Sequence, residues 1–149
     1  MPEYEIKKQI NKITGLMYVS FVLWIFIIIY QLILGLFLIV VGYGITTLLC
    51  MGYNIFGCIR YFKTITYFKN CSTEEELRYI VAYFEKSITP CWIFMFVNLV
   101  FGGFIGFAGN LYDLILSYWV KNNVGAWLMN NTEPAPYVEV NEGDYTDYQ

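Results

Sequence analysis

Four polar residues late in the chain have types and a spacing that could carry chemistry. Asn110, Asp113, Ser117 and Lys121 follow one another at intervals of three, four and four positions, which places them on one face of a helix. Asp113 is the only charged residue between Lys86 and Lys121. A carboxylate in such apolar surroundings is a candidate proton or cation site. Chance placement and a packing role are the other interpretations, and we favour packing.

A second line of small or polar residues lies on an earlier apolar segment, at Thr46, Cys50, Asn54 and Gly57. Small side chains let helices approach closely in a membrane, and polar ones hydrogen-bond across the interface. Counted from the basic residues that end the two segments, Asp113 and Asn54 lie at similar depth. We therefore predict a polar packing seam in which Asp113 contacts Asn54 or Tyr53. The seam comprises Tyr53, Asn54, Asn110, Asp113, Ser117 and Lys121.

Gly102 and Gly106 stand just upstream of this stripe and match the GxxxG pattern of close helix contact. We predict that they are helix-packing glycines. The apolar segments contain neither paired aspartates nor a serine with a histidine or lysine partner, so no catalytic residue is predicted. The chain has no histidine, and its four cysteines form no CxxC pair. We expect reduced cysteines, no metal site, no cofactor and no enzymatic activity.

The elements that position these residues follow from hydropathy. Hydrophobic residues make up 58% of the chain and charged residues 14%, against about 25% charged in soluble proteins. No charged residue occurs from 13 to 59. A helix of that length would measure about 70 Å, more than twice the roughly 30 Å of a bilayer's hydrocarbon core. We predict a first transmembrane hairpin over 14–63, with its turn between Leu34 and Gly44.

Two amphipathic segments flank this hairpin. Residues 1–13 place Ile6, Ile10 and Ile13 opposite lysines, which predicts a helix lying at the membrane surface. The cytoplasmic linker 64–89 contains a second apolar stripe, which predicts an amphipathic helix over 73–88 that ends near Pro90. A Ser72 to Glu75 capping box would start it. We favour a surface position for this helix too, although a soluble core helix would show the same stripe.

The second apolar run, 87–120, is too long for one ordinary crossing and short for two. We favour a second, shorter hairpin over 90–121, with its turn at the glycines that begin at Gly102. The alternative is one crossing to about Gly109 followed by an oblique helix. The predicted fold is an all-α membrane protein with two transmembrane helical hairpins, four helices in total.

Residues 122–149 carry five acids and no base, with Pro134 and Pro136 among them, so a disordered acidic tail is predicted. It could recruit a cytosolic partner or simply keep the end of the chain soluble. Lysine and arginine cluster in 1–12, in 60–86 and at Lys121. The positive-inside rule then places both termini in the cytoplasm. The chain offers no basic surface for nucleic acid.

One stretch resembles a known type of protein. Asn98-Leu99-Val100-Phe101-Gly102-Gly103-Phe104-Ile105-Gly106, followed by Tyr112-Asp113-Leu114 and a basic end at Lys121, resembles uncharacterised small multi-spanning membrane proteins of low-GC Gram-positive bacteria. The resemblance implies a bacterial inner membrane and supplies no activity.

We expect a non-enzymatic integral membrane protein that acts by assembly, either with itself or as an accessory subunit of a membrane complex. Its partners would be the lipid bilayer and other membrane subunits. The alternative is a pore-forming or holin-like permeability protein, or a small ion- or proton-conducting channel. These classes differ in whether the Asp113 face packs against protein or lines water.

Overall fold

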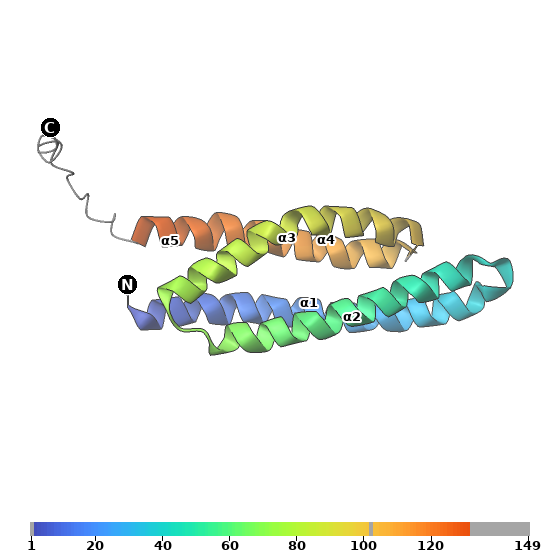
Figure 1. Cartoon of the computed structure of the whole chain (residues 1–149), viewed down its shortest axis with the longest axis horizontal. Coiled ribbons are helices and arrows are strands. Elements are labelled where there is room, and N and C mark those ends of the chain that lie inside the picture. The colour runs from blue at the N-terminus through green and yellow to red at the C-terminus, as the bar shows by residue number, and fades with distance from the viewer. Residues whose placement is uncertain (1, 102, 132–149) are drawn as a thin grey trace, which may run out of the picture.

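The chain folds into long helices joined by short links (Figure 1). The computed structural model describes residues 2–101 and 103–131. The elements in chain order are α1 (Glu3–Phe37), a 3₁₀ turn (Ile39–Val41), α2 (Tyr43–Asn70), α3 (Glu74–Phe101), α4 (Gly103–Trp119), a π-helical segment (Val120–Gly125) and α5 (Ala126–Asn131). The described residues contain no strand. The predicted tail from residue 132 onward lies outside them.

The helices pack as two antiparallel pairs. Helix α1 lies along α2, and α3 lies along α4 (Figure 1). The pairs are joined mainly where α1 meets α4, whereas α2 and α3 touch over only a short stretch. One side of the bundle is therefore less tightly closed than the other.

A glycine-dependent turn joins α1 to α2. Gly42 adopts a φ of 79°, in the left-handed region that favours glycine. Gly44 lies against the backbone of Gly35 across the turn, and a Cβ added at Gly44 would approach the Leu38 carbonyl carbon to 2.6 Å. The turn falls within the interval predicted from the glycine positions.

Among the helices of residues 2–101 and 103–131, two are long and apolar enough to cross a membrane, α1 and α3. In their most apolar 18-residue windows, only 22% and 17% of the residues are buried inside the protein. The core helix of a soluble protein is mostly buried. In α1 and α3, by contrast, most apolar side chains of these windows lie at least partly on the protein surface.

The apolar core lies at the end of the bundle that holds the N-terminus and the α2–α3 link. It contains Ile6, Ile10, Ile13, Met17, Ile65, Phe68, Cys71, Leu77, Ile80, Phe84, Leu116, Val120, Val124 and Leu128. The prediction that 1–13 forms a separate surface helix is therefore wrong, since this segment is the start of α1. Its isoleucines pack against other helices instead of facing lipid.

The predicted helix over 73–88 is likewise not separate. Its stripe packs into the same core, and the helix continues unbroken to Phe101. The alternative of a core helix describes it better. The capping box is formed one residue later than predicted: the Glu76 carboxylate accepts from the backbone N–H of Thr73 at 2.9 Å, and the Thr73 hydroxyl accepts from the Glu76 N–H at 3.3 Å.

Other predicted boundaries shift for the same reason: packing within the bundle extends the helices. Helix α2 runs to Asn70 rather than 63, so 64–89 is not a linker and only 71–73 connect α2 to α3. Helix α3 passes through Pro90, where the predicted helix ends. Residues 122–131 are helical and partly buried, so the tail does not begin at 122.

Candidate functional site

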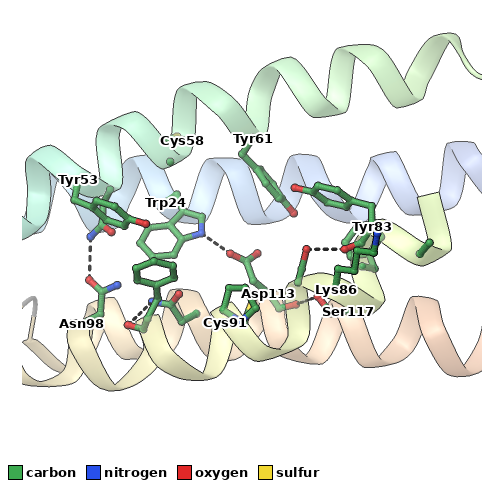
Figure 2. A pocket seen from close by; sticks show the side chains of 18 of the residues that line it. Trp24, Tyr53, Cys58, Tyr61, Tyr83, Lys86, Cys91, Asn98, Asp113 and Ser117 are labelled. Atoms are coloured by element: carbon green, nitrogen blue, oxygen red, sulfur yellow. Dashed lines mark hydrogen bonds between the residues drawn. The ribbon is translucent and has the colours of Figure 1, made fainter. Parts of the chain in front are cut away.

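Asp113 is held by two donors from α1. The Ser20 hydroxyl donates to Oδ1 of Asp113. The indole Nε1 of Trp24 donates to Oδ2 at 2.7 Å (Figure 2). Both donors are neutral. The two bonds fix the orientation of the carboxylate and join the second helix pair to the first, because Asp113 belongs to α4.

A cluster of buried amides lies farther along the bundle. The Asn54 amide nitrogen of α2 donates to Gln31 of α1 at 2.9 Å and to Asn98 of α3 at 3.0 Å. The Cys50 thiol also donates to the Asn98 oxygen, at 3.1 Å. Three helices therefore meet through side-chain amides in the bundle interior.

The predicted seam is only partly formed. The hydrogen bonds of Asp113 go to α1, not to Asn54 or Tyr53, and Asn54 bonds within the amide cluster instead. Tyr53 packs its ring against Phe94, with centroids 5.0 Å apart. Tyr53, Asn54 and Asp113 nevertheless all line one cavity.

The remaining seam residues, on α4 and the π-helical segment, contact their own helix or α3. The Asn110 amide donates to the Gly106 carbonyl at 3.1 Å, and the Ser117 hydroxyl donates to the Asp113 carbonyl at 2.8 Å. Lys121 forms an exposed ion pair with Glu85 at 2.8 Å. The hydrogen bond and negative charge of Glu85 raise the pKa of Lys121.

Gly106 permits close approach of the helices at the amide cluster. A Cβ there would lie 2.9 Å from the Asn98 oxygen and 3.1 Å from the Gln31 nitrogen. Gly109, which was not predicted as a packing residue, is as tightly enclosed. A Cβ added at Gly109 would lie 2.5 Å from the Ile27 side chain. Gly102 lies outside the described residues, so its predicted role stays a prediction.

A cavity of about 430 Å³ opens between α2 and α3 and reaches Asp113. Its walls are rich in aromatic side chains, and Figure 2 shows several of them around the carboxylate. Trp24, Tyr53, Tyr61, Tyr83, Phe94 and Asp113 are among the lining residues. Pockets of about 300–1,000 Å³ with apolar walls and a few fixed polar groups are the usual form of small-molecule sites.

Two polar groups in this cavity have unused capacity. No lysine or arginine within 2–101 and 103–131 forms an ion pair with Asp113. The buried Tyr61 hydroxyl makes no hydrogen bond of normal geometry to another described residue. Ser20 lies near the Tyr61 hydroxyl, but its proton is donated to Asp113, so the Tyr61 oxygen keeps its capacity to accept a hydrogen bond. Buried polar groups usually find a partner, so both groups are suited to an incoming ligand.

Sequence reasoning missed the partners on α1. A signal for them exists: Ser20 and Gln31 are uncharged polar residues in a long apolar run, separated by eleven positions, about three helical turns. Trp24 lies on the same face, and all three are buried. Asn98 is a comparable polar residue within the apolar part of α3.

No protein-family model, curated protein or solved structure matches the chain.

Proposed function

We propose that the chain is a multi-pass integral membrane protein without enzymatic activity. What supports this is the distribution of polarity between the interior and the surface. Buried polar residues include Ser20, Gln31, Asn54, Asn98 and Asn110, whereas large apolar residues are exposed along the outer faces of α1, α2 and α3. In lipid this arrangement is favourable, because apolar surface meets hydrocarbon while polar groups pair internally.

In this proposal, two helical hairpins span a bacterial inner membrane, and the end of the bundle that holds the N-terminus and α5 is cytoplasmic. An Asn130→Cys variant tests the orientation. Residue 130 is exposed at the end of α5, so a membrane-impermeant maleimide should label it only after the cells are opened, provided that the four native cysteines are first replaced by serine. Labelling of intact cells would refute the orientation.

We propose that the function is to bind a small organic ligand within the bundle. The observation that supports it is the cavity of about 430 Å³ whose aromatic walls converge on the oriented carboxylate of Asp113. Several of its rim residues, among them Tyr53, Tyr79 and Lys86, are exposed. A ligand dissolved in the bilayer could therefore enter sideways between α2 and α3.

A matched pair of glycine variants tests this function. Gly57 lines the cavity and Gly52 does not, yet a Cβ added at either position meets nothing within 4 Å. Both lie on α2, so leucine has the same intrinsic effect on the helix. Small molecules that co-purify with the protein in nanodiscs, measured by mass spectrometry, should be lost from Gly57→Leu and retained by Gly52→Leu. Equal content in both variants, or none in the unmodified protein, would contradict ligand binding.

Cation or proton conduction is a second candidate, favoured by the polar amide cluster that continues the line of polar groups beyond Asp113. Flux into liposomes that contain the purified protein tests it, and an absence of flux between pH 5 and pH 8 would exclude it. Assembly with another chain stays a prediction. The predicted polar faces form hydrogen bonds mainly within this chain, so they do not support association with another chain.

A further inference from the structure

We propose that the cavity binds an amphipathic organic amine in its protonated form, with the ammonium group against Asp113. This inference rests on the ligand-binding function proposed above and names the class of ligand. It follows from three features of the cavity: an oriented carboxylate without a cationic partner among the described residues, a buried hydroxyl without a partner of normal geometry among them, and aromatic walls.

The carboxylate supplies the charge. Its two oxygens each accept one hydrogen bond, from Ser20 and Trp24, and an ionised carboxylate can accept about four. An ammonium group would use the remaining capacity and supply the positive charge that no described lysine or arginine provides. Lys86 also lines the cavity, but it is exposed at the rim and makes no ion pair with Asp113.

The Tyr61 hydroxyl favours an ammonium with N–H groups over a quaternary ammonium. This oxygen is buried and has no partner of normal geometry among the described residues. Figure 2 shows the Tyr61 ring extending from α2 toward the level of Asp113. A primary or secondary ammonium could donate one proton to Asp113 and another to Tyr61, whereas a quaternary nitrogen has none to donate.

The walls suit the rest of such a molecule. Trp24, Tyr53 and Phe94 place aromatic rings along the cavity, and cations are attracted to the faces of such rings. The mouth between α2 and α3 would face the bilayer, where the apolar body of an amphipathic amine partitions. A metal ion would gain little from these walls, because it prefers several oxygen ligands.

The test uses dansylcadaverine, a fluorescent primary amine, and its uncharged N-acetyl derivative. Both are titrated against the full chain in nanodiscs, with empty nanodiscs as the background. We expect saturable binding of the amine, at least tenfold tighter than binding of the acetylated compound. Asp113→Asn should weaken amine binding at least tenfold. Glu85→Gln removes the same charge outside the cavity, at an exposed site, and should change affinity less than twofold.

Tyr61→Phe retains the ring and should weaken amine binding severalfold while leaving a trimethylammonium analogue unaffected. The comparison of the two probes on the unmodified chain requires no variant to fold. Equal affinity for amine and acetylated compound, both abolished by Gly57→Leu, would overturn the amine assignment and leave ligand binding intact. If neither probe binds, the amine assignment is overturned, and the co-purified molecules then decide the proposed function separately.

Discussion

Gly44→Ala is expected to lower the free energy of unfolding by about 2–3 kcal/mol, the cost of forcing an extra methyl group into a closely packed site. The methyl group would approach the Leu38 carbonyl carbon to 2.6 Å and the Gly35 carbonyl oxygen more closely still. Both neighbours are backbone atoms of the preceding segment, so no side chain can rotate away. The α1–α2 turn must open to admit the methyl group.

Gly52→Ala is the matched control, because it lies on the same helix and its added Cβ meets nothing within 4 Å. Alanine is the better helix former by about 1 kcal/mol, so this variant should be neutral or slightly more stable. Unfolding would be followed by circular dichroism as sodium dodecyl sulfate replaces a mild detergent. Equal stability of the two variants would show that the Gly44–Gly35 contact is not a constraint.

Ile10→Ala is expected to lower the free energy of unfolding by about 2–5 kcal/mol, as for other large-to-small changes in a core. Ile10 has no exposed surface and lies in the core with Phe68 and Leu77. Because Ile10 is fully buried, neither lipid nor water fills the space that the lost atoms leave, and a cavity remains. The same denaturation measurement reports the effect.

Ile29→Ala is the control on the same helix, since half of the Ile29 side chain is exposed. It should cost far less, because lipid can fill the space of the lost atoms. The pair also distinguishes the bundle from a helix at the membrane surface. If 1–13 lay on lipid, Ile10→Ala would weaken membrane attachment and leave unfolding nearly unchanged.

The long helices could be predicted from the sequence because they depend on local patterns. Glycines near the middle of a charge-free run located the α1–α2 turn, and a serine before acidic residues located the start of α3 to within a few residues. The predicted boundary at residue 14 does not exist, because α1 begins at Glu3. The sequence does not show what the apolar face of an amphipathic helix packs against. The stripes that begin at Ile6 and Leu77 have the same pattern whether they meet lipid or each other, and only tertiary structure decides between these.

The candidate site was harder to predict from the sequence, because it too depends on tertiary structure. The identity of Asp113 as the polar centre of α4 followed from its spacing and its surroundings. Its partners did not, because equal depth leaves open which neighbouring helix the residue faces. Helix α4 is oriented so that Asp113 faces α1, where Ser20 and Trp24 lie. Helix α2 is oriented so that the amide of Asn54 faces Gln31 and Asn98.

The placement of the interior hydrogen bonds has a consequence for biogenesis. Within the first helix pair, the Asn54 amide already donates to Gln31. In the second pair, Asp113 takes both of its side-chain donors from α1. If the chain is inserted into a bilayer as proposed, the first pair can therefore stand alone with this bond already formed. The Asp113 carboxylate of the second pair has neither of these donors until that pair docks against α1. Because α1 is synthesised before α4, the donors are already in place when Asp113 enters the membrane, and its charge need not be exposed to lipid.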